Sequence, residues 1–182
     1  LGDYTANFDG GMDDFVVETL TPPATWHVTT DDSFSGTSSL NFSDPATGTY
    51  AVSGSDANGL VWSAPIQVPP FVQGRPFGEF WYRLFVVDEL RVHVAVDGEY
   101  EPSTPTFVDG EIVMVGDTKW FSWYLTNTTD GAWVKSRVDL DEFRGEEVQL
   151  VFEFASGDAA SNQFAGPFLD NVGFGTTCLP GA

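Results

Sequence analysis

The sequence predicts an all-β protein, built as a sandwich or a barrel of short antiparallel strands. Alternation of apolar and polar residues with period two dominates the chain, in short runs rich in β-branched and aromatic residues. Clusters of Gly, Pro, Asn, Asp and Ser separate these runs. No segment keeps apolar residues at helical spacing over a helix length. With 182 residues the chain suits one domain with a substantial core.

The expected strands follow one another at the spacing typical of such folds. They cover residues 15–20, 26–30, 38–42, 79–87, 90–96, 119–125 and 148–154. One short helical element is expected within "LDEFRG", where Asp139 or Asp141 caps a single turn before Gly145. The regular turn spacing favours an all-β domain over any mixed architecture.

The alternation also assigns faces to two of these strands. In 90–96, Val92 and Val94 point one way, while Arg91 and His93 point the other. In 148–154, one face carries Val148, Leu150, Phe152 and Phe154, and the other carries Gln149, Val151 and Glu153. We therefore expect half-buried antiparallel strands with one core face and one wetter face.

The charge balance limits the partners. Seven Lys and Arg residues stand against 27 Asp and Glu, for a formal net charge of −20. Such a surface repels phosphate backbones and anionic membranes, so nucleic acid is not an expected partner. No apolar run approaches the roughly 20 residues that a membrane-spanning helix needs. The acidity is consistent with a solvated surface, and also with cation binding.

Cys178 is the single cysteine, so no disulfide forms within this sequence. We expect the domain to cover residues 1–175, and 176–182 ("TTCLPGA") to be a tail that leads into a following domain. There Cys178 would find a partner, which fits an oxidising extracellular setting. The start at Leu1, without Met, favours an excised or processed piece of a larger protein.

Several spaced motifs occur in a familiar order. "NFDGG" is followed by "FSGTSSL", then by "WSAPI", and the chain closes with "VDLDEFRGEEVQLVFEF" and "GPFLDNV". This order resembles the MAM-type jelly roll of secreted bacterial proteins. Similar domains are the cleaved-adhesin domains of gingipains and the C-terminal module of immune-inhibitor-A-type metalloproteases. Two departures are the missing disulfides of animal MAM domains and Asn171 in place of the second acid of an Asp–Asp pair.

The resemblance implies a jelly-roll β-sandwich of two antiparallel sheets that serves as an accessory or adhesive module rather than a catalyst. It also implies a secreted or cell-surface setting, and a bound cation, usually calcium, that ties the first strand to the last.

Asp170 is the centre of the expected cation site, because a carboxylate between Leu169 and Val172 needs a partner to be buried. In a jelly roll Asp9 would lie near it. Backbone carbonyls of Ser35 and Gly36 would complete the shell, with Asp32 as a further ligand. The alternative is that Asp170 accepts backbone N–H bonds in a turn and Asp9 belongs to an Asx turn. Either way, the role is structural.

A second candidate site consists of aromatic rings and cations on the wetter faces, as expected for stacking on sugar rings and binding their hydroxyls. Its predicted residues are Trp81, Arg83, Arg91, His93, Trp120 and Tyr124. Two alternatives remain open. The rings are core or rim residues, and the cations pair with nearby acids such as Glu79, Glu99 or Glu153.

The sequence contains few of the His and Cys residues that common catalytic sites need. With only His27 and His93 and one terminal cysteine, the usual zinc sites are hard to assemble, and no Gly-x-Ser-x-Gly motif follows a strand. We expect a non-catalytic binding or adhesion module of a larger bacterial protein, with carbohydrate as the main ligand class and extracellular protein as another. The alternatives are an accessory domain that packs against a protease-like neighbour, and a glycoside hydrolase or lyase with paired carboxylates.

Overall fold

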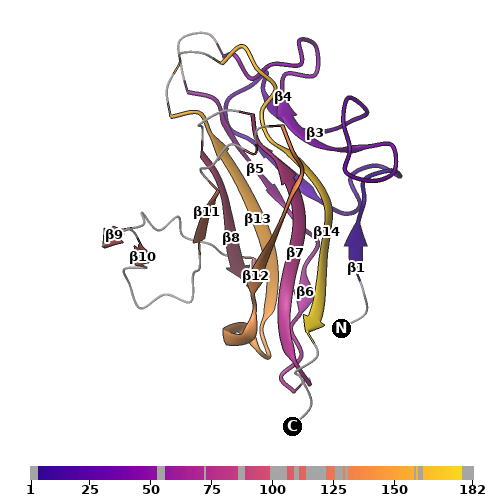
Figure 1. Ribbon diagram of the computed structural model, residues 1–182, viewed down its shortest axis with the longest axis vertical. Helices are drawn as coiled ribbons and strands as arrows, with labels where there is room; N and C mark the ends of the chain where they lie inside the picture. The colour runs from indigo at the N-terminus through magenta and orange to yellow at the C-terminus, as the bar shows by residue number, and fades with distance from the viewer. Residues whose placement is uncertain are drawn as a thin grey trace.

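The computed structural model is an all-β sandwich, which confirms the predicted jelly-roll class of two antiparallel sheets (Figure 1). It describes residues 4–52, 56–71, 73–85, 89–98, 106–108, 111–113, 122–125, 129, 131–157, 159 and 162–177.

Sheet A has six strands. In order across the sheet they are β12 (Val134–Asp139), β7 (Arg75–Arg83), β14 (Phe168–Thr177), β4 (Ser39–Ser43) and β3 (Thr25–Thr29), with β1 (Tyr4–Ala6) also paired to β14. Sheet B also has six strands. They are β11 (Ser122–Leu125), β8 (Glu89–Val96), β13 (Glu147–Ala155), β5 (Asn58–Trp62) and β2 (Val16–Thr19), with β6 (Ile66–Gln67) paired to β13. β9 (Thr106–Val108) and β10 (Glu111–Val113) pair with each other.

The first and last strands lie side by side. β1 pairs antiparallel with β14, so that Thr5 lies opposite Gly173 and Ala6 opposite Val172. This confirms the expectation that the N-terminal segment meets the last strand. β14 continues to Thr177, two residues beyond the expected domain boundary at 175.

The core lies between the sheets and uses the predicted faces. Val92, Val94 and the apolar face of β13 are buried in one cluster with residues of sheet A. Aromatic rings from the two sheets pack edge to face. The ring centroids of Phe80 and Phe152 are 5.0 Å apart, and the ring planes meet at 83°. Such pairs add to the burial of apolar area that stabilises the fold.

The outer face of sheet B is less wet than expected. Ala95 and Val151 are fully buried there and pack with Leu60 and Trp62 in a second small cluster. The expectation that Val151 faces water is therefore wrong, because neighbouring strands supply apolar side chains on this face as well.

The single expected helical turn is present as a 3-10 turn at Asp141–Phe143. The expectation that Asp139 or Asp141 caps this turn is wrong, because its N-cap residue is Leu140, which makes no side-chain capping bond. The carboxylate of Asp139 instead accepts the backbone N–H of Asp141 at 2.9 Å, as in an Asx turn. Within the described part of the chain, no helix is long and apolar enough to cross a membrane.

Candidate functional site

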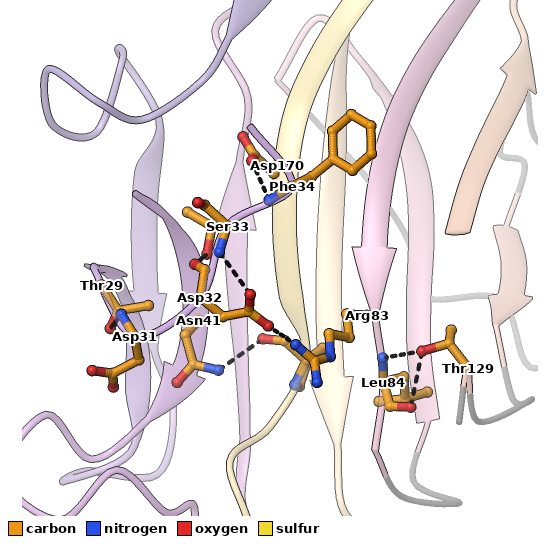
Figure 2. Close-up of polar contacts among 12 residues, drawn as sticks. Thr29, Asp31, Asp32, Ser33, Phe34, Asn41, Arg83, Leu84, Thr129 and Asp170 are labelled. Atoms are coloured by element: carbon orange, nitrogen blue, oxygen red, sulfur yellow. Dashed lines mark hydrogen bonds and ion pairs between the residues drawn. The ribbon is translucent and has the colours of Figure 1, made fainter. Parts of the chain in front are cut away.

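Asp170 is fully buried, and its carboxylate holds a loop that lies far away in the sequence. One oxygen, Oδ2, accepts the backbone N–H groups of Phe34 at 2.8 Å and Ser35 at 2.9 Å. The other, Oδ1, accepts the N–H of Asn171 at 2.7 Å. Figure 2 shows the bond to Phe34 at the turn of this chain segment, which we call the 33–38 loop. Three N–H donors satisfy a buried carboxylate that would otherwise be costly.

Asp9 holds the same loop from its other end. Its Oδ1 accepts the N–H groups of Thr37 at 2.6 Å and Ser38 at 3.0 Å, and the Thr37 hydroxyl at 3.1 Å. The loop passes so close that a Cβ at Gly36 would collide with the Asp9 carboxylate, and Gly36 has φ +67°. Glycine is the residue that tolerates both conditions.

The two carboxyls differ in their titration. Burial raises the pKa of Asp170 above its ordinary value, although three backbone N–H bonds act in the opposite direction; the charge of Asp9 raises it further. The N–H of Thr37 is the main cause that holds the pKa of Asp9 below its ordinary value. The charge of Asp9 thus acts on the buried carboxyl of Asp170 on the other side of the loop that both hold.

The structure brings together part of the predicted cation site. Asp9 and Asp170 flank Ser35 and Gly36, as expected, but the carboxylate of Asp32 is turned away and pairs with the guanidinium of Arg83 (Figure 2). The expectation that Asp32 faces the other acids is wrong, because this ion pair draws its carboxylate toward β7.

One carbonyl of the expected shell and a neighbouring hydroxyl are already engaged. The Gly36 carbonyl accepts the hydroxyl of Ser33 at 3.3 Å, and the hydroxyl of Ser35 donates to Oδ1 of Asn171 at 3.0 Å. Among the described residues, no group of three or more His, Cys, Asp or Glu side chains is placed to hold a metal. Of the three acids in the predicted shell, Asp9 and Asp170 are the two that hold the 33–38 loop.

The 33–38 loop also places an aromatic ring on sheet A. Phe34 stacks on Trp81 with ring centroids 3.7 Å apart and planes 12° apart. Trp133 meets the edge of Phe34 at 6.2 Å. Trp81 therefore lies on the outer face of sheet A, on β7, with one ring face covered by Phe34.

A hollow of about 330 Å³ lies beside this stack, and we call it the sheet A groove. It is lined by Thr5, Phe77, Glu79, Trp81, Asn171, Gly173, Phe174 and Gly175. Phe77, Glu79 and Trp81 alternate along β7 and so share its outer face. Across from them β14 presents Gly173 and Gly175, which have no side chains to fill the space.

Glu79 is held by two cations from the neighbouring strand β12. Nζ of Lys135 lies 2.7 Å from its carboxylate, and Nε of Arg137 donates to the other oxygen. Burial alone would raise the pKa of Glu79, but these hydrogen bonds and charges hold it below its ordinary value. The same cations lie over the rings of Trp81 and Phe77, at 5.6 and 4.4 Å from the centroids.

The six predicted ligand residues do not form one site. Trp81 and Arg83 lie on the outer face of sheet A, whereas Arg91 and His93 lie on β8, on the outer face of sheet B. Arg83 is therefore separated from Arg91 and His93 by the core, and these residues cannot share one ligand.

On sheet B the expected pairing with acids is confirmed. His93 Nε2 lies 2.7 Å from the carboxylate of Glu153, and Arg91 lies 3.4 Å from its other oxygen. Burial alone would raise the pKa of Glu153, but the hydrogen bond from His93 and the charges of both partners hold it below its ordinary value.

Trp120 and Glu99 lie outside the described residues. Tyr124 lies on β11, opposite Arg91 in the strand register. Sequence reasoning missed Phe34 and the two β12 cations, and it did not assign Glu79 or Asn171 to a ligand site. Alternation along β7 could have placed Phe77 and Glu79 beside Trp81, but the register with β12 has no sequence signal.

The sequence matches no family model, and no curated protein matches it. Solved structures do match its fold. TmCBM61, solved in complex with β-1,4-galactotriose, is 10% identical, covers 94% of each chain and gives a TM-score of 0.61. The K1 cleaved adhesin domain of Lys-gingipain from Porphyromonas gingivalis is 12% identical, with 97% of this chain and 99% of that one covered and a TM-score of 0.57.

A third match is the enzymatically active domain of tailspike protein 4 from bacteriophage CBA120. It is 13% identical, with a TM-score of 0.55, and the match covers 94% of this chain and 20% of that one. At these identities the likeness shows the fold alone. The predicted likeness to gingipain adhesin domains is confirmed at that level, while the likeness to MAM domains and to immune-inhibitor-A-type modules stays a prediction.

Proposed function

We propose that this chain is a non-catalytic module that binds carbohydrate in the sheet A groove. The observation that carries the proposal is the lining of this groove, which joins the rings of Trp81 and Phe77 to the carboxylate of Glu79 and the amide of Asn171. Rings contact the apolar faces of sugars, and carboxylate and amide groups bind their hydroxyls. The volume lies at the lower end of the range of ligand sites.

The fold supports the same proposal. A carbohydrate-binding module and an adhesin domain share this sandwich over nearly their whole length. Fold alone does not carry function to another chain, so the assignment rests on the groove. Its strands provide a rigid support, since β7 lies between β12 and β14 over most of its length.

The groove favours binding over hydrolysis. Glycoside hydrolysis uses two carboxyls about 5 to 9.5 Å apart, one of them with a raised pKa. Of the described residues that line the groove, Glu79 is the one carboxylate, and Lys135 and Arg137 lower its pKa. Such a group is poorly suited to act as a general acid.

Calcium is part of the proposal as a structural ion. Asp9 raises the pKa of the buried Asp170 through its charge, and a cation between the two would offset that repulsion. The rest of a calcium shell would come from backbone carbonyls and water. Bound there, the ion would stiffen the 33–38 loop that places Phe34 on Trp81.

The proposed setting is a larger secreted or cell-surface protein, with carbohydrate or an extracellular protein as the partner. An accessory domain that packs on a catalytic neighbour is a second candidate, favoured by one observation. Phe71 is 94% exposed, beside a hollow of about 520 Å³ that Pro70, Gln73 and Arg144 also line. Exposed apolar residues at such a site fit a protein contact. The test is whether this domain binds the neighbouring domain of the parent protein. Binding that is lost in Phe71→Ser would support this candidate.

Retention on insoluble and soluble polysaccharides tests the main proposal. Trp81→Ala should abolish retention on the bound glycan, and the matched variant Trp62→Ala, on the outer face of sheet B, should retain it. Loss of retention in Trp62→Ala alone would move the site to sheet B. Retention on no glycan at all would refute carbohydrate binding.

A further inference from the structure

The cations of this chain are unevenly distributed. Only seven Lys and Arg residues balance 27 acids, yet four of the seven occupy outward positions on two adjacent strands of sheet A. They are Arg75, Arg83, Lys135 and Arg137. A chain with net charge −20 thus carries most of its positive charge on one face.

Three acids on this face are paired with cations, whereas Asp9 and Asp170 beside them accept backbone N–H groups instead. Asp32 pairs with Arg83, and Asp139 lies 3.6 Å from Arg75. Glu79 is different, because it is shared by Lys135 and Arg137. Two positive charges on one carboxylate give this group of three residues a net positive charge at the rim of the sheet A groove.

Both of these cations can take a further partner. The side chain of Lys135 is 40% exposed and that of Arg137 is 51% exposed. A lysine has three donors and an arginine five, whereas Glu79 occupies one on each. Both cations also lie over rings that line the groove, Lys135 over Trp81 and Arg137 over Phe77, so a ligand in the groove would lie close to them.

We infer that the groove binds an anionic glycan, a polysaccharide with carboxylate or sulfate groups on its sugar rings. This inference rests on the proposed function. Arg137 and Lys135 would hold the anionic group by charge-assisted hydrogen bonds, while Trp81 and Phe77 contact the ring. Glu79 positions the two cations and binds hydroxyls.

The overall negative charge does not oppose this reading. Exposed charges are largely screened beyond about 8 Å at physiological ionic strength, so an anionic chain at the groove responds mainly to the cations beside it. Acids elsewhere on the surface would instead disfavour contact at other faces, which directs an anionic polymer to this one.

Calorimetric titration with defined polysaccharides tests the inference. Polygalacturonate and a sulfated galactan are the two anionic arms, and methyl-esterified polygalacturonate and neutral galactan are their uncharged counterparts. The expected result is binding to one anionic arm that is at least about tenfold tighter than binding to its counterpart, since a single charge-assisted contact already provides that factor.

Arg137→Gln and Lys135→Gln should each lower the affinity for the anionic glycan about tenfold. Each should also weaken the dependence of this affinity on salt. Arg144→Gln, which removes one charge away from the groove, should leave both unchanged. Melting curves for all three variants verify that each is folded.

Equal binding to charged and neutral glycans would overturn the anionic ligand and leave the proposed function standing. Binding to no glycan would overturn both. A third result is equal binding to every polyanion, dextran sulfate included, with the same loss of affinity in Arg144→Gln as in Arg137→Gln. That result would show a non-specific charge effect and would also overturn the inference.

Discussion

The carboxylate of Asp170 accepts the backbone N–H of Phe34 at 2.8 Å, and the ring of Phe34 stacks on Trp81 at 3.7 Å. A buried acid on the last strand therefore positions an aromatic ring beside the sheet A groove. Asp9 holds the other end of the same loop. The acids that close the sandwich at its first and last strands also arrange the surface that we propose to bind ligand.

Asp170→Asn should destabilise the protein by about 1–3 kcal/mol at neutral pH. An amide offers one acceptor oxygen in place of two, and its NH₂ group would face an N–H donor that the carboxylate now accepts. Thermal or denaturant unfolding measures the loss, and tryptophan fluorescence reports the change at Trp81. Asp31→Asn, an exposed acid just before the loop, is the matched control and should change little. Equal stability of both variants would contradict the role given to Asp170.

The contribution of Asp170 to stability should depend on pH in opposite directions without and with bound calcium. With chelator, the raised pKa of Asp170 means that the folded state binds this proton more tightly than the unfolded state. Its contribution to the free energy of unfolding should then decrease as pH rises from the ordinary value of 3.8 upward. A bound cation favours the ionised form, so with saturating calcium the contribution should instead be lost as pH falls.

The difference between wild type and Asp170→Asn, measured from pH 3 to 8 with calcium or with chelator, isolates this contribution from those of other groups. Identical profiles and melting temperatures in the two conditions would refute the calcium proposal, because a ligand that binds only the folded state must raise its stability.

Gly36→Ala should destabilise more than Gly48→Ala. Both glycines have left-handed backbones, with φ +67° and +70°, so both variants bear the same conformational cost of about 1 kcal/mol. Only at Gly36 does a Cβ meet the carboxylate of Asp9, whereas nothing lies within 4 Å at Gly48. Denaturant unfolding of the pair measures the difference. Equal losses would show that Asp9 and the loop are not in close contact.

Gly175→Val should block the groove without unfolding the protein. A Cβ at Gly175 would lie 3.0 Å from the Phe77 ring, and the methyl groups of valine would take up space beside that ring in the groove that both residues line. The position is extended and valine favours strands, so the melting temperature should stay close to that of wild type. Glycan retention should fall, whereas Glu18→Val on β2 of sheet B should retain it. Unchanged retention in a folded Gly175→Val would place the ligand elsewhere.

Sequence patterns predicted what depends on local alternation. The inward residues of β8 and β13, the single turn at 141–143 and the meeting of Asp9 and Asp170 around Ser35 follow from period, turn chemistry and the resemblance of motif order. These local patterns do not predict which strands pair, or in which register. The register of β7 with β12 brings Lys135 and Arg137 to Glu79, and no local pattern encodes it.

The same limit explains the error over the ligand residues. Trp81 and His93 both alternate outward from their strands, but only the assignment of β7 and β8 to different sheets shows that they lie on opposite faces. Asp32 was likewise predicted to join Asp9 and Asp170, but the fold places Arg83 beside it, and the two form an ion pair.

The central claim is that ligand binds in the sheet A groove. A backbone NMR titration of the intact domain with the oligosaccharide that it retains most strongly tests this directly. The predicted result is that the largest shift changes occur at the amides of Asn171, Gly173 and Gly175 and at the indole of Trp81. Changes confined to β8 and β13 on sheet B, or none at saturating oligosaccharide, would contradict it.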